Sequence, residues 1–266
     1  MTARIAIIGF GSITQTLLSV LEASDDICVS NIVTRPERIG APGYGWKDAR
    51  FVSSTDQIDP EVELVVEAAG HSALRKYAVD VVESGRRLAL VSSGALADDD
   101  FRGAIQAAAR RNRSEIHVLS GAIGALDALS TARAAGKQTV RYTGIKPSKA
   151  WKGTPAEDCI DLDAITTPTT FFTGSARKVA QCFPKNANVA ATIALAGAGF
   201  DETEVALVAD PDATHNRHVV DSRGALGEFR FETTSMPLSV NPRTSGSTVF
   251  SILAFLRGDS NTIRLA

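Results

Sequence analysis

The chain has 266 residues, of which 28 are Lys or Arg and 30 are Asp or Glu, so its formal net charge is -2 at pH 7. Its 44% hydrophobic and 22% charged composition is typical of a folded globular protein and argues against a mostly disordered chain. A charge this close to zero gives no long-range attraction to nucleic acid or to an anionic membrane. An anionic ligand must therefore be held by a local group of cations.

Cysteine usage and hydropathy narrow the class of protein further. Cys28, Cys159 and Cys182 show no CxxC spacing, which argues against a disulfide framework or a zinc cluster. The sequence contains no HExxH motif and no dense cluster of acidic residues, so no other kind of metal site is indicated. The start of the chain lacks a secretory leader, and no apolar stretch approaches the roughly 20 residues of a membrane span. We expect a cytoplasmic protein with no metal, nucleic-acid or membrane partner.

The first half of the chain alternates short apolar runs with segments of helical periodicity. The apolar runs, which predict buried strands, are 4–8, 27–33, 64–66, 88–91 and 116–119. The helical segments are 13–21, 73–84 with Ser72 as N-cap, and 98–111. Repeated strand–helix–strand units with continuous apolar strands predict an α/β fold, a Rossmann-type doubly wound parallel sheet. We assign this dinucleotide-binding domain to residues 1–122.

The second half has longer and more polar strand patterns. One helix is predicted over 121–135 and another over 188–196. The strand patterns lie at 138–146, 203–209, 216–222 and 226–233. Strands grouped in this way predict a smaller, mostly antiparallel α+β domain over residues 123–239. An amphipathic helix is predicted over 245–256, and we expect residues 240–266 to pack back onto the first domain.

A glycine-rich turn, Gly-Phe-Gly-Ser-Ile-Thr, joins the first predicted strand to the first predicted helix. Gly9 would allow a tight turn, and Gly11 would let the backbone approach a pyrophosphate at the helix N-terminus. Ser12 and Ile13 follow as further expected cofactor contacts, and Thr14 stands where the usual fingerprint has its third small residue. The alternative is an ordinary strand-to-helix turn. The position in a first βα unit favours dinucleotide binding.

The end of the second predicted strand bears on the choice of cofactor. A carboxylate at this place usually bonds the ribose of NAD, but here Arg35 follows the strand and no acid precedes Glu37. An arginine can form a bidentate pair with the extra phosphate of NADP. The pattern predicts that NADP is accepted at least as readily as NAD, and the alternative is that Arg35 is a solvated surface residue.

Histidines are the first candidates for proton transfer near neutral pH. His117 lies in a predicted buried strand, where a core role is the simplest interpretation. His71, like Ala69, follows a strand at the carboxyl edge of the sheet and is a candidate to line the cofactor crevice. His215 and His218 begin a predicted strand, and residues three apart in a strand point to opposite faces. At most one of the two can face a given cleft, and spacing alone does not select it.

The segment 146–154 gathers three lysines with a tryptophan, two hydroxyl side chains and a glycine. In a chain of nearly zero net charge, it is a candidate for a local anion site. The alternative is a solvated basic loop.

Taken together, these segments resemble the L-aspartate dehydrogenase family along nearly the whole chain. The matching segments, in chain order, are GFGSIT, VVEAAGHSALRKYA, LVSSGALAD, LSGAIGALDAL, KPSKAWKGTPAE, FPKNANVAATIALAG, VADPDATHNRHVV and GEFRFE with NPRTS. The resemblance implies oxidation of L-aspartate to iminoaspartate with NAD or NADP. Iminoaspartate can feed NAD biosynthesis or hydrolyse to oxaloacetate and ammonia. The resemblance also implies a homodimer, with the smaller α+β domain serving substrate binding and dimerisation.

The same resemblance implies roles for individual residues. It places the active-site histidine of the family on His218 and two cofactor contacts on Ala122 and Asn188. His218 would act as a base on the substrate amine or on the water that attacks the imine. Composition, and not the resemblance, favours Lys146 and Lys152 for the two substrate carboxylates, with Thr154 as a further donor. Asn188 is also expected to contact the substrate.

Two alternatives remain open at this point. One is a related two-domain dehydrogenase or reductase of another aspartate-pathway metabolite, such as a dihydrodipicolinate-type reductase. A semialdehyde dehydrogenase would need a nucleophilic cysteine near the cofactor, and none of the three cysteines lies in a matching motif. The other alternative is a non-catalytic NAD(P)-binding sensor, which would keep the glycine-rich turn but would not need His218.

Overall fold

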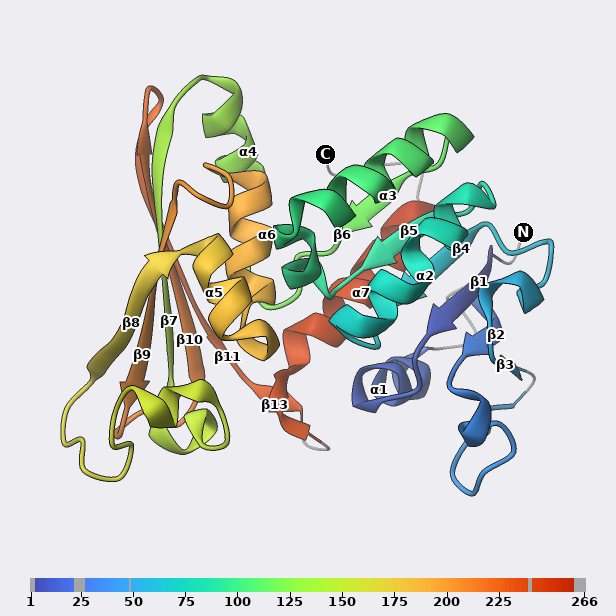
Figure 1. Ribbon diagram of the computed structural model, residues 1–266, viewed down its shortest axis with the longest axis horizontal. Helices are drawn as coiled ribbons and strands as arrows, with labels where there is room; N and C mark the ends of the chain where they lie inside the picture. The colour runs from blue at the N-terminus through green and yellow to red at the C-terminus, as the bar shows by residue number, and fades with distance from the viewer. Residues whose placement is uncertain (1–2, 22–26, 48, 239–240, 261–266) are drawn as a thin grey trace. The chain divides into compact units, whose positions relative to one another are not determined.

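The structure is a computed structural model that describes residues 3–21, 27–47, 49–238 and 241–260 (Figure 1). The chain divides into two compact units. Residues 1–119 and 249–266 form the first, called here the N-terminal unit, and residues 120–248 form the second, called the central unit. The predicted boundary at 239/240 falls outside the described residues.

The N-terminal unit is built on a six-stranded parallel sheet, which confirms the predicted Rossmann-type fold. Its strand order is β3-β2-β1-β4-β5-β6. The strands are β1 (Ala3–Ile8), β2 (Ile27–Val33), β3 (Arg50–Val52), β4 (Leu64–Glu67), β5 (Arg87–Leu90) and β6 (Ile116–Val118). The central strands are continuous apolar runs because helices cover both faces of the sheet. Strand order reverses between β1 and β4, so a ligand crevice is expected at their carboxyl ends.

Among the described residues, the α-helices that accompany this sheet are α1 (Ser12–Val20), α2 (His71–Glu83), α3 (Asp99–Asn112) and α7 (Gly246–Ser260). In Figure 1, α2 and α3 lie together in front of the sheet and α7 runs behind it. The ring centroids of His117 in β6 and Phe255 in α7 are 4.9 Å apart, which fixes α7 against the edge of the sheet.

Two predictions for this unit were wrong in detail. The side chain of His117 is not a core residue: it is 31% exposed, and its Nε2 lies 3.1 Å from Oε2 of Glu115. The reason is that β6 is an edge strand. The helix predicted from 73 with Ser72 as N-cap begins at His71 instead, after Gly70, whose φ is +100°. A glycine conformation, and not a serine hydroxyl, therefore starts α2.

The central unit contains a five-stranded mixed sheet of order β11-β10-β7-β9-β8. Its strands are β7 (Gln138–Pro147), β8 (Thr169–Ser175), β9 (Thr203–Asp210), β10 (Asn216–Gly224) and β11 (Gly227–Ser235). Only β7 and β9 pair in parallel among these strands, so the sheet is mostly antiparallel as predicted. A separate two-stranded ribbon joins β12 (Pro237–Leu238) to β13 (Asn241–Ser245). The sequence patterns did not reveal β3 or β8.

Helices α4 (Leu126–Ala134), α5 (Ala176–Cys182) and α6 (Asn188–Ala196) gather beside this sheet (Figure 1). A Cβ built on Gly197, at the end of α6, would lie 3.1 Å from Cγ2 of Val140 in β7, so α6 packs directly on that strand. The helix predicted over 121–135 is shorter than expected. Gly121 and Ala125 have φ of +64° and +59°, and such left-handed residues form a turn before α4.

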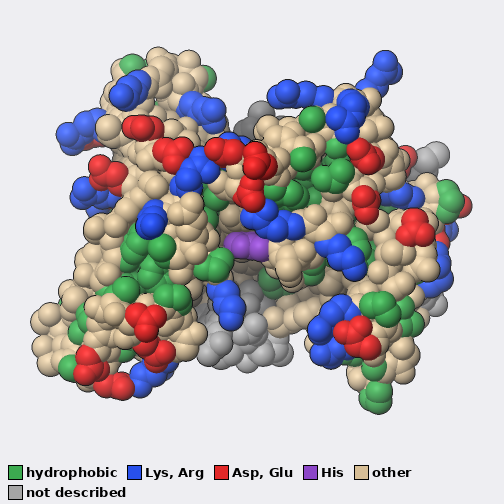
Figure 2. Space-filling model, viewed as in Figure 1, with side chains coloured by type: hydrophobic (Ala, Val, Ile, Leu, Met, Phe, Trp, Pro, Cys, Tyr) green, Lys and Arg blue, Asp and Glu red, His purple; other side chains and the backbone are tan. Residues whose placement is uncertain are grey.

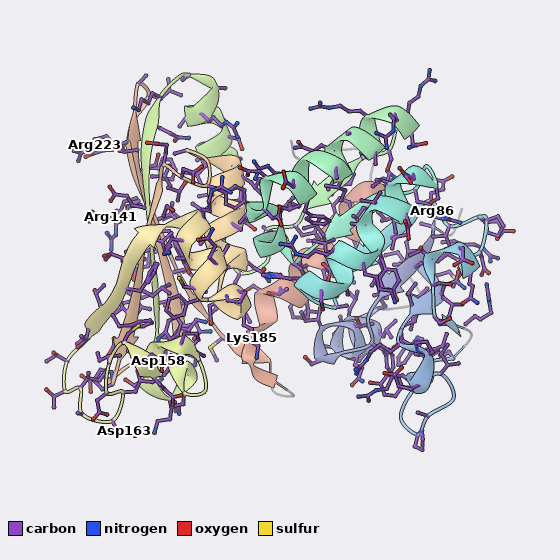
Figure 3. All side chains as sticks on the ribbon, viewed as in Figure 1. Arg86, Arg141, Asp158, Asp163, Lys185 and Arg223 are labelled. Carbon is purple, nitrogen blue, oxygen red and sulfur yellow. The ribbon has the colours of Figure 1, made fainter. Side chains whose placement is uncertain are left out.

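Side chains alternate between the two faces of β7. Val140, and with it Tyr142, Gly144 and Lys146, lies on the face that α6 covers. Arg141 lies on the opposite face, where it pairs with Glu204 at 2.9 Å. Figure 3 shows Arg141 and Arg223 extending from the side of the sheet away from the helices. The covered face is therefore the place to look for buried polar groups.

Candidate functional site

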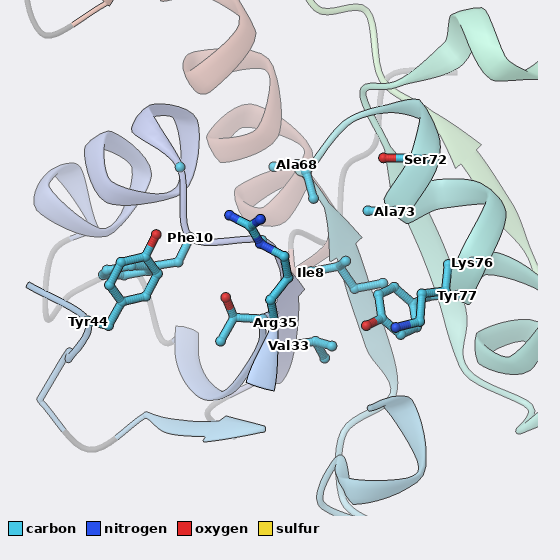
Figure 4. Close-up of a pocket in the computed structure, with 14 residues that line it drawn as sticks. Ile8, Phe10, Val33, Arg35, Tyr44, Ala68, Ser72, Ala73, Lys76 and Tyr77 are labelled. Carbon is cyan, nitrogen blue, oxygen red and sulfur yellow. The ribbon is translucent and has the colours of Figure 1, made fainter. Parts of the chain in front are cut away.

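A cavity of about 550 Å³ opens in the N-terminal unit at the carboxyl ends of β1, β2 and β4 (Figure 4). This is the point where the strand order reverses. Four of the expected cofactor contacts line it, namely Gly9, Gly11, Arg35 and Ala69. The other predicted contacts of this unit, which are Ser12, Ile13 and His71, lie at the starts of α1 and α2 and are not among its lining residues.

Only glycine fits at position 9. Its φ is +100°, and a Cβ built on it would lie 2.6 Å from Cβ of Ala69 and 3.2 Å from the carbonyl oxygen of Ala68. Its backbone N–H donates to the carbonyl of Val33 at 2.8 Å, which ties the turn to β2. The turn after β1 and the turn after β4 are therefore in direct contact, as a close backbone approach requires.

Gly11 is the N-cap of α1, and no side chain caps the helix. Apart from its neighbours in the chain, no described atom lies within 4 Å of a Cβ built on Gly11, so the protein itself leaves this approach open. An open, uncapped helix start beside the cavity fits the pyrophosphate of a dinucleotide. Thr14, one turn further along α1, is fully buried, and its Oγ1 has no hydrogen-bond partner.

Glu67, at the end of β4, holds the backbone of the turn beside this cavity, a role that no sequence motif indicated. Its Oε1 accepts hydrogen bonds from the backbone N–H groups of Ala69 and Gly70 at 2.7 and 2.8 Å. It also accepts from Oγ of Ser92 at 2.9 Å, and Oε2 accepts from the N–H of Ser92 at 3.2 Å. Burial raises the pKa of Glu67 despite these bonds. The only sequence signal was an acid ending a buried apolar run.

Arg35 extends from the end of β2 into the cavity (Figure 4). Its side chain is 67% exposed, and its Nε lies 3.6 Å from Oε1 of Glu37, which is a long and solvated ion pair. Nη1 of Arg38 donates to Oη of Tyr44 at 2.7 Å, and the ring of Tyr44 lies 5.4 Å from that of Phe10. The cavity thus has an aromatic wall and an exposed cation at the place where the adenosine ribose of a dinucleotide is expected.

The central unit brings His218, Tyr142 and Lys146 onto one face of its sheet. His218 in β10 pairs in register with Gly144 in β7, so its ring lies between the positions of Tyr142 and Lys146. Oη of Tyr142 and Nδ1 of His218 are 2.8 Å apart, and both side chains are buried, with exposures of 2% and 4%. His215 precedes the strand and contacts Oγ1 of Thr214 at 2.7 Å. Of the two histidines, only His218 belongs to this cluster.

Burial and charge set the protonation states of the cluster. Desolvation by burial, followed by the charge of Lys146, lowers the pKa of His218 to about 4. Burial raises the pKa of Tyr142 well above its usual value and lowers that of Lys146 to about 8. The ammonium of Lys146 lies 4.7 Å from the ring centroid of Trp151, which offsets part of its desolvation. At neutral pH, His218 is a neutral imidazole and Lys146 is mostly cationic.

The other expected substrate contacts have local partners. Nζ of Lys152 lies 2.6 Å from Oδ1 of Asp163, and this exposed pair raises the pKa of Lys152. Figure 3 shows Asp163 at the outer tip of its loop. Oγ1 of Thr154 donates to the carbonyl of Trp151 at 2.6 Å and accepts from the N–H of Ala156 at 3.3 Å. Ala122 lies in the turn before α4, and Asn188 is the first residue of α6.

Charged side chains of both signs are interspersed over the face shown in Figure 2. Within the described residues, no group of three or more His, Cys, Asp or Glu side chains could hold a metal ion. Over the same part of the chain, no helix has the length and apolar character that crossing a membrane requires.

Comparisons with known proteins agree with this geometry. Residues 127–259 match the family model "Aspartate dehydrogenase, C-terminal", and residues 9–119 match "Homoserine dehydrogenase, NAD binding domain". The L-aspartate dehydrogenase of Cupriavidus taiwanensis is 42% identical over 98% of this chain and 99% of its own length. The chain belongs to the L-aspartate dehydrogenase family. The resemblance inferred from the sequence motifs is thereby confirmed.

Further relatives support this membership of the L-aspartate dehydrogenase family. The L-aspartate dehydrogenase of Ruegeria pomeroyi is 43% identical over 98% of this chain and 94% of its own length. The crystal structure of aspartate dehydrogenase from Thermotoga maritima superposes with a TM-score of 0.79 at 28% identity, covering 100% of both chains. As in that family, the N-terminal unit is an NAD(P)-binding domain, and the protein is an NAD(P)-dependent oxidoreductase.

Proposed function

We propose that this protein oxidises L-aspartate to iminoaspartate with NAD or NADP, as its relatives are named for doing. The observation that best supports this assignment is the buried cluster in the central unit, where a neutral imidazole shares one sheet face with a lysine. A dicarboxylate amino acid needs a cation to hold a carboxylate and a base to accept a proton from its ammonium. Lys146 and His218 supply these two groups.

The reaction has simple requirements. NAD(P)⁺, when bound, accepts the hydride that leaves the α-carbon of the substrate. The hydride can leave only if the nitrogen lone pair forms the imine bond, so the ammonium must first lose a proton. His218 is proposed as the base, acting on the amine or on the water that later attacks the imine. Hydrolysis of the imine then gives oxaloacetate and ammonia.

Lys146 is the stronger candidate of the two lysines for holding a substrate carboxylate. Lys152 already pairs with Asp163 at 2.6 Å, and Thr154 is engaged by its own loop. A carboxylate bound beside Lys146 would offset the charge that lowers the pKa of His218. Substrate binding would therefore raise the basicity of the imidazole at the moment when a base is needed. Asn188 is proposed as a neutral donor to substrate or cofactor.

For the cofactor, we propose that Gly9, Gly11 and Ala69 contact the pyrophosphate. Ser12 and Ile13 stand at the start of α1, His71 stands at the start of α2, and Ala122 stands before α4. Arg35 is proposed to meet the 2′-phosphate of NADP, so NADP should be used at least as readily as NAD. We also propose a cytoplasmic homodimer whose product feeds NAD biosynthesis.

A substrate panel tests this proposal directly. The purified protein is offered L-aspartate, D-aspartate, L-glutamate, homoserine and aspartate semialdehyde with NAD or NADP, and reduced nicotinamide is followed by absorbance. We expect turnover with L-aspartate to exceed that with every other compound by at least about tenfold in kcat/KM. Preferred turnover of homoserine or the semialdehyde would replace the assignment with a related dehydrogenase. Binding of NADP without turnover of any amino acid would favour a sensor.

A further inference from the structure

The partner of His218 at its Nδ1 atom is Tyr142, and the β7–β10 ladder holds this contact in place. The two residues are 76 positions apart in sequence, yet Oη and Nδ1 are 2.8 Å apart. Their rings are nearly parallel, with an interplanar angle of 20° and centroids 6.0 Å apart. Because Nδ1 faces the phenol, the second ring nitrogen, Nε2, is the one left for a reacting group.

Gly144 makes room for this contact. It stands between Tyr142 and Lys146 on the same face of β7 and directly opposite His218 in the ladder. A Cβ built on Gly144 would lie 2.7 Å from Oη of Tyr142 and 3.1 Å from Cζ. Glycine is unfavourable in the middle of a strand unless a close approach requires it. Here the close approach is that of the phenol, which lies over Gly144 on its way to His218.

The chemistry of a phenol suits this position. Its hydroxyl oxygen can accept a hydrogen bond from Nδ1–H, and the phenol stays protonated because burial raises the pKa of Tyr142 above its usual value. A neutral imidazole that donates from Nδ1 keeps its lone pair on Nε2, which is the form that a base requires. When Nε2 gains a proton, the Nδ1–H···Oη bond is still present. The same contact therefore serves both protonation states of His218.

We propose that Tyr142 is a positioning residue that accepts a hydrogen bond from Nδ1–H of His218 and thereby holds His218 in the tautomer with a free lone pair on Nε2. The proposal rests on the proposed function of His218 as a base, and it extends the site to Tyr142 and Gly144. Tyr142 itself is not proposed to touch the substrate or to transfer a proton.

Imidazole ¹⁵N chemical shifts test the tautomer in the intact protein, whether or not His218 is catalytic. In the wild type near neutral pH, we expect His218 to be protonated at Nδ1 and unprotonated at Nε2. In Tyr142→Phe, which keeps the ring and removes only Oη, we expect a mixture of the two tautomers. A wild-type protein that carries the proton on Nε2, or an unchanged tautomer in Y142F, would overturn the proposal.

Kinetics test whether Tyr142 acts through His218. We expect Y142F to lower kcat by about tenfold, with KM for L-aspartate and NADP within about twofold of wild type. In a His218→Ala background, adding Y142F should change kcat by less than about twofold, because there is no imidazole left to orient. Full additivity of the two losses would assign Tyr142 a role independent of His218 and would contradict the proposal.

Ser222→Ala is the matched control. Oγ of Ser222 donates to Oε1 of Gln138 at 3.0 Å, so this variant also removes a buried hydroxyl contact between β7 and β10. S222A should keep kcat within about twofold, and a loss equal to that of Y142F would indicate general loosening of the sheet. Gly144→Ala is a second variant that tests the contact between Tyr142 and His218, because the added Cβ would displace Oη of Tyr142. It should reproduce the tautomer mixture even if Y142F does not fold.

The outcomes also separate this inference from the function on which it rests. If H218A leaves turnover unchanged, the base assignment fails, while the ¹⁵N shifts still report whether Tyr142 orients the ring. If H218A abolishes turnover and Y142F leaves both the tautomer and kcat unchanged, the base assignment stands and the role of Tyr142 is wrong.

Discussion

The two units present their candidate sites in different ways. The cavity of the N-terminal unit is shaped mainly by backbone: Gly9 and Gly11 at the turn, and the amides that Glu67 holds after β4. The cluster of the central unit is made of side chains, namely His218, Tyr142 and Lys146. A backbone site tolerates the loss of most single side chains, whereas a side-chain site does not. Single truncations should therefore affect catalysis in the central unit more than cofactor binding in the N-terminal unit.

The largest expected effect is that of His218→Ala. Loss of a general base typically costs about 100- to 10,000-fold in rate, so we expect kcat to fall within that range while the Kd for NADP stays within about twofold. Steady-state kinetics and a fluorescence titration of NADPH measure the two quantities. If H218A lost turnover and NADP affinity to the same extent, the side-chain cluster and the cofactor cavity would not be functionally separate sites.

Lys146→Met should have the second largest effect, on substrate binding and on pH dependence. Without the ammonium, we expect KM for L-aspartate to rise by at least about tenfold, because a desolvated carboxylate loses its charged partner. The charge of Lys146 is one cause of the lowered pKa of His218, after burial. The acidic limb of the kcat/KM profile, which in the wild type should lie near the His218 pKa of about 4, should therefore move to higher pH. A limb that moves lower or stays fixed contradicts this electrostatic coupling.

Arg35→Ala tests the contribution of one side chain to cofactor binding in the cavity of the N-terminal unit. Because Arg35 is well exposed and only loosely paired with Glu37, its removal should leave stability and the KM for NAD within about twofold. The KM for NADP should rise by about tenfold, since the pair with the 2′-phosphate is lost. Both values come from initial rates with L-aspartate at saturation. A KM for NADP far above that for NAD in the wild type, unaffected by R35A, would refute the role of Arg35.

Thr14→Val should have the smallest effect, and on stability alone. The hydroxyl of Thr14 is fully buried without a hydrogen-bond partner, so replacing it by a methyl group removes a desolvated polar atom without changing the shape of the side chain. We expect the free energy of unfolding to rise by about 1 kcal/mol in urea titrations, with NADP affinity unchanged. A less stable variant would show that the hydroxyl is paired in solution.

The contrast between a site shaped by local backbone and a site made of distant side chains also explains what could be predicted from the sequence. The glycine-rich turn and the apolar strands are local patterns, and helix α6 was found at the predicted residues, Asn188–Ala196. The helix predicted over 121–135 was too long, because apolar spacing alone does not reveal that Ala125 has a positive φ. Strand β8 was missed because its polar and aromatic residues show no clear alternation.

The side-chain cluster required knowledge of the fold. Spacing could not separate His215 from His218, and nothing in the local sequence connects Tyr142 to either of them. Only the pairing of β10 with β7 brings Tyr142 to Nδ1 of His218. Glu67 was also overlooked, because its role depends on amides from two loops that meet only when β4 and β5 are adjacent.

The place of α7 in the chain has a consequence for biosynthesis. Val249, Ile252, Leu253 and Leu256 are buried residues of the N-terminal unit, yet residues 120–248 are synthesised before them. At roughly 5–20 residues per second, the ribosome needs several seconds to pass from β6 to α7. Throughout that interval the first unit lacks its final helix, and the apolar surface that α7 covers is exposed to chaperones and to other nascent chains.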